Sequence, residues 1–149
     1  MKKTLGFIFL GLALATSSFA APAAVKISLG TGTAKDKEKM VYSKDKLTVK
    51  AGAQVALTFK NNSSSKGMTH NWVLVKPGKG QMVQDAAPAA GPGKNWTPEI
   101  PEVLVKSKLI DAGESEEIAF TAPTEPGDYP FVCTFPGHTT MKGILKVTK

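Results

Sequence analysis

Short runs in which apolar and polar side chains alternate constrain the fold of this chain more than any other feature. In one run, Val55, Leu57 and Phe59 all fall on the same face. A period of two predicts a strand with one buried face. About seven or eight such strands, separated by turn residues, favour an all-β fold, an antiparallel β-sandwich. The predicted strands are Val25–Leu29, Lys46–Lys50, Gln54–Lys60, His70–Val75, Val103–Ile110, Glu116–Thr121, Asp128–Cys133 and Lys142–Thr148.

The alternation breaks between Lys76 and Pro101, where proline and glycine recur. Within this stretch, Gln81–Ala87 is predicted to form a short helix. We interpret residues 76–101 as one irregular, partly helical excursion from the sheet rather than a second domain, and call it the flap segment.

The first twenty residues are typical of a secretory signal peptide. Lys2 and Lys3 precede an apolar run, and Ser18-Phe19-Ala20 gives a small-x-small cleavage pattern. The uncharged run ends near Thr16, which is short for a membrane-spanning helix. We therefore expect residues 1–20 to be removed and residues 21–149 to form a single exported domain. No cysteine lies near the cleavage site, so no lipid anchor is expected.

The charge of the chain is moderately positive. Nineteen basic residues stand against twelve acidic ones, for a formal net charge of +7. Such an excess favours association with acidic surfaces. Nucleic-acid binding is disfavoured because every basic residue is lysine, which lacks the bidentate geometry of arginine, and the lysines are spread along the chain.

The segment between the last two predicted strands concentrates metal-binding chemistry. It holds Cys133, which is the only cysteine, together with His138 and Met141. The other histidine of the chain is His70. A thiolate, two imidazoles and a weak thioether form the donor set of blue-copper sites. We therefore predict a copper site built from these four residues.

Each of these residues also has an ordinary interpretation. A lone inward cysteine is commonly a small core residue, and a lone histidine is commonly a hydrogen-bonded polar residue. Zinc would accept the same donors, but catalytic zinc needs an open water position, and no carboxylate lies close in sequence to act as a base. The convergence of all four residues is what favours copper.

Three motifs resemble the azurin and auracyanin branch of the cupredoxins: Gly67–Leu74, Lys108–Ser115 and Cys133–His138, the last reading Cys-Thr-Phe-Pro-Gly-His. The resemblance covers essentially all of the chain after the signal peptide. It implies a Greek-key β-sandwich, the cupredoxin fold, that carries one type 1 copper and shuttles single electrons. It further implies that His70, Cys133 and His138 are the equatorial ligands and Met141 the axial ligand.

The resemblance also implies roles for residues beside the ligands. Asn71 is expected to tie the two ligand loops together through Thr134, and the Phe135 amide to donate to the Cys133 sulfur. In azurins the carbonyl before the first histidine approaches the metal; here that residue is Thr69, where azurins carry glycine. A second departure is that two residues, not three, separate the loop histidine from the methionine.

Apolar residues flank the histidines in sequence and predict a docking surface. We expect Met68, Phe135, Pro136 and Gly137 to ring the edge of His138, so that this ligand serves as the electron port. We name these four residues the docking patch. The expected partners are redox proteins, such as a cytochrome or a copper or haem enzyme with an acidic surface, and the chain is expected to be a monomer in the periplasm or otherwise exported.

Three other functions compete with electron transfer. A periplasmic copper carrier or buffer would use the same ligands. An oxidase or nitrite reductase would need further copper centres, which two histidines cannot supply, so no enzymatic activity is expected. A metal-free adhesion-type sandwich would leave the Cys, His and Met convergence unexplained.

Overall fold

The computed structural model describes residues 23–149, and the predicted signal peptide lies outside the described residues. Eight strands, one α-helix and one short 3₁₀-helix follow one another along this part of the chain. In chain order they are β1 (Val25–Gly30), β2 (Lys46–Lys50), β3 (Gln54–Lys60), β4 (Val73–Val75), α1 (Gly80–Ala90), η1 (Pro92–Lys94), β5 (Val103–Lys106), β6 (Ser115–Thr121), β7 (Gly127–Val132) and β8 (Lys142–Thr148).

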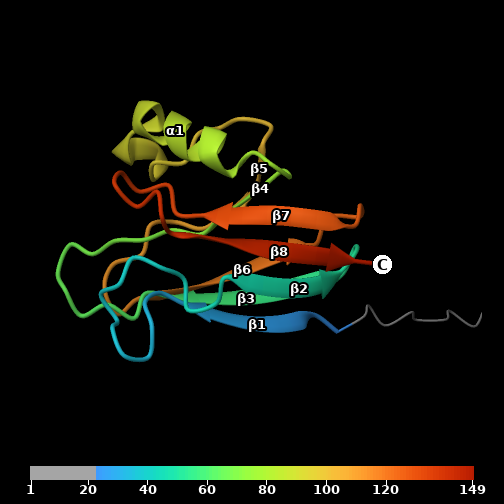
Figure 1. Cartoon of the computed structure of the whole chain (residues 1–149), viewed down its shortest axis with the longest axis horizontal. Helices are drawn as coiled ribbons and strands as arrows, with labels where there is room; N and C mark the ends of the chain where they lie inside the picture. Colours follow the sequence, from blue (N-terminus) through green and yellow to red (C-terminus); the bar gives the residue numbers. More distant parts are fainter. Residues whose placement is uncertain (1–22) are drawn as a thin grey trace, which may run out of the picture.

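The strands form two sheets that pack face to face as a sandwich (Figure 1). One sheet has the order β1-β3-β6 and the other β2-β8-β7-β4-β5. The prediction of an all-β sandwich is confirmed, and four of the six strand pairs within residues 23–149 are antiparallel as expected, but the other two are parallel. β1 runs parallel to β3, and β2 runs parallel to β8. These partners are not joined by hairpins; the chain visits the opposite sheet between β1 and β3, which leaves both free to run in one direction.

The core lies between the two sheets, and the alternation predicted from the sequence builds it. Leu57 and Phe59 of β3 are buried against Phe131 of β7 and Leu145 of β8. In β3 and β8 the neighbours of these residues point outward and are half-buried or exposed. Burial of large apolar side chains is the main favourable contribution to folding, so these strands define a rigid platform for the loops at their ends.

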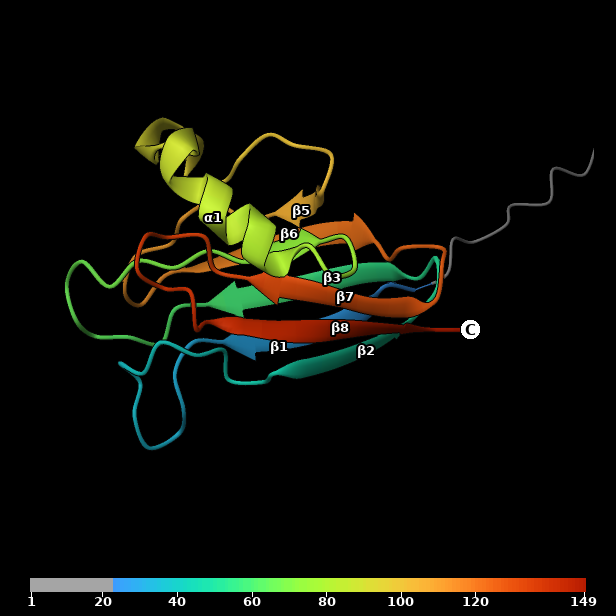
Figure 2. The same cartoon turned by 45° about the horizontal axis from the view of Figure 1, so that its top comes forward.

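The helix α1 lies outside the five-stranded sheet, beside β7 (Figure 2). It forms within the flap segment and extends the predicted helix at both ends. Its Val83 joins Val73, Val75 and Val132 in a second, smaller apolar cluster. Because α1 covers this outer face, β4 is buried on both sides, whereas most strands of the sandwich have one face in water.

The strand predicted at His70–Val75 is shorter in the structure and begins at Val73. Before this point the ladder is interrupted, because the Ser107 hydroxyl accepts the hydrogen bond of the Trp72 amide at 2.8 Å. His70 keeps only an isolated bridge to Ile110. Similarly, Cys133 lies one residue beyond the end of β7, and β5 ends at Lys106 rather than at Ile110. The predicted metal ligands therefore lie in loops.

The loops that follow β1, β3 and β7 gather at one end of the sandwich, on the left in Figure 1. The first of the two histidines and the segment Cys133–Met141 both lie at this end. Among residues 23–149, no helix has both the length and the apolar character needed to cross a membrane.

Candidate metal centre

Two loops bring three of the predicted ligands together. One ligand atom each from His70, Cys133 and His138 lies within 4.8 Å of the other two, and all three residues are buried. The Cys133 Sγ lies 3.6 Å from His138 Nδ1. The two imidazole rings have their centroids 4.7 Å apart. Residues separated by more than sixty positions in the chain thus converge on one point.

The loop between β7 and β8 is closed by backbone hydrogen bonds. The Cys133 amide donates to the Met141 carbonyl at 3.0 Å, and the Met141 amide donates to the His138 carbonyl at 2.9 Å. A further turn is closed by the bond from the His138 amide to the Phe135 carbonyl, and Gly137 adopts a φ of 86° that favours glycine there. Met141 is fully buried, and its backbone pairs with both neighbouring ligand residues.

His70 is fixed from a different part of the chain. Its amide and carbonyl both bond to Ile110, at 3.1 and 2.9 Å. The buried amide of Asn61 donates to the carbonyls of Met68 and Ile110, which secures the segment just before His70. The backbone that carries the His70 side chain is therefore held in place by hydrogen bonds that do not involve a ligand.

The chemistry of the donor atoms fits a soft metal ion. His70 Nδ1 is buried and has no hydrogen-bond partner among residues 23–149. A buried polar atom without a partner is costly, and a bound metal would use this lone pair. Burial, with a contribution from His138, lowers the pKa of His70 to about 4, and burial also lowers the pKa of His138. Both imidazoles are therefore neutral near pH 7, which is the form that coordinates metal.

Burial shifts the pKa of the Cys133 thiol upward, in the opposite direction from the pKa values of the two histidines. Burial raises the pKa of Cys133 to about 11, although hydrogen bonds from the backbone amides of Asn71 and Phe135 oppose the rise. A metal cation would displace this proton and bind the thiolate. One thiolate and two imidazoles could hold a copper ion, and the buried Met141, whose backbone bonds to Cys133 and His138, could supply a thioether.

Asn71 links the two loops directly. Its Nδ2 lies 2.7 Å from Thr134 Oγ1, and its Oδ1 accepts a hydrogen bond from the Thr134 amide at 2.8 Å. Its Nδ2 also lies 3.1 Å from the Asn95 carbonyl and 3.2 Å from Thr97 Oγ1. Asn71 is fully buried, so these contacts satisfy a polar group that water does not reach.

Thr69 is half-buried, and its hydroxyl donates to Asp111 Oδ1 at 2.8 Å. This bond leads away from the buried donors and towards the loop before β6. The approach of the Thr69 carbonyl to a bound metal stays a prediction.

The structure adds residues that the sequence reasoning did not identify. Asn95 and Thr97 bond to Asn71, and Gln84 of α1 bonds to the loop after β7. Trp96 packs edge to face against Phe135 with a centroid distance of 6.2 Å. All four lie in the flap segment, where no periodicity signals which side chains turn inward. The one available signal was the helical spacing of Val83 and Ala87, which places Gln84 beside the buried face.

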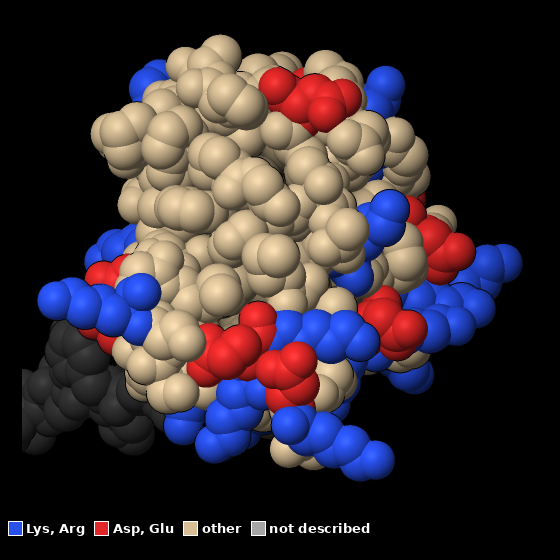
Figure 3. Space-filling model, turned by 60° about the vertical axis from the view of Figure 1, so that its left-hand side comes forward, with Lys and Arg blue, Asp and Glu red and all other residues tan. Residues whose placement is uncertain are grey.

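The residues of the docking patch differ in exposure, and one of them contacts a predicted ligand. Met68 and Phe135 are half-buried, whereas Pro136 and Gly137 are exposed. Phe135 packs against the His138 ring with a centroid distance of 4.9 Å. Figure 3 shows the end of the molecule that carries the loops: a broad uncharged area occupies its centre, and charged side chains gather around the rim.

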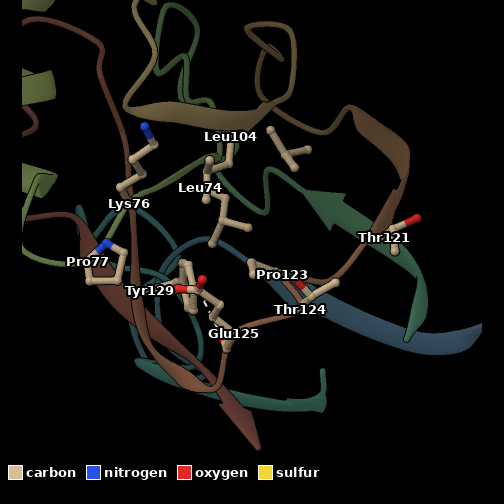
Figure 4. Close-up of a pocket in the computed structure, with 10 residues that line it drawn as sticks. Leu74, Lys76, Pro77, Leu104, Thr121, Pro123, Thr124, Glu125 and Tyr129 are labelled. Carbon is tan, nitrogen blue, oxygen red and sulfur yellow. Dashed lines mark hydrogen bonds between the residues drawn. The ribbon is translucent and has the colours of Figure 1, made fainter. Parts of the chain in front are cut away.

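A cavity of about 490 Å³ lies elsewhere in the sandwich (Figure 4). It is lined by Leu74, Tyr129 and residues of the connection between β6 and β7, and the Tyr129 hydroxyl donates to the Glu125 carbonyl at 2.9 Å. Tyr129 lies in the first half of β7, whereas Cys133 follows its last residue. The cavity contains none of the predicted ligands and takes no part in the metal centre.

A two-sheet sandwich with a buried Cys and two His at one end defines the class of mononuclear copper proteins with a cupredoxin fold. The chain belongs to the plastocyanin/azurin family of copper-binding proteins, whose pattern it matches over residues 29–148.

Individual relatives agree with this assignment. The chain is 40% identical to Auracyanin-A of Chloroflexus aurantiacus over 114 residues, which cover 74% of this chain and 68% of the relative. It is 35% identical to an azurin of Pseudomonas denitrificans over 118 residues, or 72% of this chain and 90% of the azurin. Among solved structures, the dithionite-reduced auracyanin of the photosynthetic bacterium Roseiflexus castenholzii superposes with a TM-score of 0.75 at 34% identity, covering 86% of this chain and all of the auracyanin.

Proposed function

We propose that this chain is a blue copper electron carrier that passes single electrons between redox proteins, with His70, Cys133, His138 and Met141 as the copper ligands. The observation that carries the proposal is the convergence of three buried donor atoms within 4.8 Å, in a chain of the plastocyanin/azurin family. As in its azurin and auracyanin relatives, the role is that of a carrier and not of an enzyme.

The protein contributes a donor set that main-chain hydrogen bonds would hold in place around copper. Copper, when bound, supplies a one-electron couple between Cu(I) and Cu(II), and this mixture of thiolate, imidazole and thioether donors suits both states. Main-chain bonds hold Cys133 against Met141, and His70 against Ile110. Ligands fixed in this way move little when the electron arrives or leaves.

His138 is the ligand that reaches the surface. Its exposed fraction is 7%, compared with 1% for both His70 and Cys133. The docking patch surrounds it with uncharged side chains, so a partner could approach without removing water from charged groups. Weak redox encounters bury less than about 1,200 Å², and a small patch of this kind is sufficient. His138 is therefore the route by which the electron enters and leaves.

The docking patch is tested by placing a charge in it. Met68→Lys is expected to slow electron transfer with a redox partner while the visible spectrum of the copper protein is unchanged. The matched control is Val25→Lys, which replaces another accessible apolar residue in β1, away from the ligand loops. Equal electron-transfer rates for the two variants would show that the docking patch has no part in electron transfer.

A second measurement separates a carrier of electrons from a carrier of copper ions. Only the electron carrier is expected to show reversible reduction with fast electron self-exchange.

The proposal extends to location and partners. The amino-terminal pattern of residues 1–20 supports export, after which residues 21–149 would work as a single domain in the periplasm. The excess of lysine over acidic residues favours partners with an acidic docking surface, such as a cytochrome or another copper or haem protein. Charged side chains of both signs gather around the uncharged area in Figure 3, and the lysines among them would attract such a partner to this end of the molecule.

A further inference from the structure

Gln84 is a buried polar side chain in the middle of α1 that the ligand set does not account for. Its exposed fraction is 6%, and it shares the buried face of the helix with Val83 and Ala87. Its Nε2 lies 3.0 Å from the Cys133 carbonyl and 3.3 Å from the Thr139 carbonyl. One side chain of the flap segment thus bonds to both ends of the loop that contains His138.

The orientation of the Gln84 amide follows from these contacts. A side-chain NH₂ group has two hydrogens, and each carbonyl can accept one of them. The reversed amide would point its oxygen at two carbonyl oxygens, so only the donor orientation is compatible with the surroundings. Both hydrogens are used, and each is committed to the ligand loop.

The peptide group that follows Cys133 is held from two sides. Its carbonyl accepts the hydrogen bond from Gln84 of α1, and its N–H donates to Asn71 Oδ1 at 2.8 Å. The Cys133 amide itself is paired with Met141. The rotation of the backbone at Cys133, and hence the direction of its side chain, is therefore fixed by contacts from three separate elements.

The way α1 packs against the sheet makes the two hydrogen bonds of Gln84 important. A cavity of about 500 Å³ lies between the beginning of the helix and the sheet, bordered by Gly80, Gln84, Pro130 and Val132. The first turn approaches β7 closely, since a Cβ at Gly80 would lie 3.3 Å from the Pro130 side chain. The cavity borders the helix from Gly80 to Gln84, so Gln84 connects α1 to the ligand loop beside a place where apolar contacts are incomplete.

We infer that Gln84 is a positioning residue for Cys133. Through its hydrogen bonds to the Cys133 and Thr139 carbonyls, it makes the orientation of the thiolate ligand depend on the position of α1. The inference rests on the proposed copper site and goes beyond it, because it assigns the flap segment a part in setting the properties of the metal. Hydrogen bonds behind a ligand orient it and tune the metal that it binds. Loss of these two bonds should therefore change the copper centre while all four ligands remain.

The test compares two methionine substitutions in the same helix. Gln84→Met keeps the length of the side chain and removes both donors. Gln81→Met is the matched control, because Gln81 is exposed and, among residues 23–149, its side chain bonds only to Asp85, one turn further along the same helix. Amide hydrogen exchange across residues 133–141 is measured in the copper-free proteins, and the visible spectrum and reduction potential in the copper-loaded ones.

In Gln84→Met, exchange within residues 133–141 is expected to become about tenfold faster or more, and the thiolate-to-copper band and reduction potential to shift relative to Gln81→Met. A Gln84→Met protein that is less stable but has the band, potential and loop exchange of the control would overturn the inference.

If Gln84→Met does not fold, the wild-type protein supplies the test, because the Nε2 protons of Gln84 should exchange far more slowly than those of Gln81. Equally fast exchange of the two would refute the inference. Failure of the wild type to bind copper would instead refute the proposed function. The hydrogen-exchange measurements on the copper-free proteins would still test the role of Gln84.

Discussion

Replacing Asn71 by leucine tests how the two ligand loops are held together. The substitution approximately conserves volume and removes every polar contact of a fully buried side chain. Asn71 Oδ1 loses the Thr134 amide, and Nδ2 loses the Thr134 and Thr97 hydroxyls and the Asn95 carbonyl. The main-chain bond from the Tyr42 hydroxyl to the Asn71 carbonyl is unaffected.

The expected cost follows from the bonds that can exist at the same time. Nδ2 has two hydrogens for three acceptors, so it makes two full bonds, and Oδ1 makes a third. At about 1 kcal/mol for each hydrogen bond, Asn71→Leu should lower the free energy of unfolding by about 3 kcal/mol. The Thr134 amide is left buried without its acceptor, which places the loss at the upper end for three bonds.

Urea unfolding of the copper-free proteins measures this loss without any contribution from metal binding. The control is Asn62→Leu, which removes one bond, from Nδ2 to the Thr31 carbonyl, at a half-buried position. It should cost about 1 kcal/mol. The contrary result is that Asn71→Leu lowers the free energy of unfolding by no more than Asn62→Leu does. The hydrogen bonds between the two ligand loops would then contribute less to stability than their geometry indicates.

Two further predictions concern the loop and strand that flank the site. Hydrogen bonds from Ser63 and neighbouring serines lower the pKa of Glu38 from 4.5 to about 2, so its contribution to stability is complete above pH 4.5 and is lost as the pH falls towards 2. Acid titration of unfolding should show this loss, and Glu38→Gln should make the curve flatter over that range; parallel curves would contradict the assignment. Gly143→Ala should destabilise the protein by about 1–3 kcal/mol, because its Cβ would lie 2.3 Å from the Phe131 ring. Gly93→Ala, where a Cβ meets nothing within 4 Å, serves as its control, and equal melting temperatures for the two variants would refute the predicted clash.

The strands could be predicted well where one face meets the core and the other meets water. Lys46–Lys50, Gln54–Lys60 and Lys142–Thr148 have the same bounds in the sequence prediction and in the structure. The prediction was wrong before Val73, because a serine hydroxyl replaces a ladder bond there, and periodicity carries no information about such side-chain contacts. Strand direction was also wrong for two pairs, since alternation is the same in parallel and antiparallel strands.

The candidate ligands could be identified because their chemistry is rare in this chain. One cysteine and two histidines left few combinations, and only four residues separate Cys133 from His138. Gln84 and Thr97 could not be identified in the same way. Their hydrogen bonds depend on the path of the flap segment, which is set by tertiary contacts with the loop after β7 and with Asn71, and the helical spacing of Val83 and Ala87 does not reveal these partners.

The most direct measurement is the visible spectrum of the protein after addition of one equivalent of Cu(II), for the wild type and for Cys133→Ser. We expect the wild type to develop an intense thiolate-to-copper charge-transfer band at one copper per chain, and the variant to lack it. A colourless wild-type protein, or a Cys133→Ser variant that keeps the band, would contradict the copper site proposed for this chain.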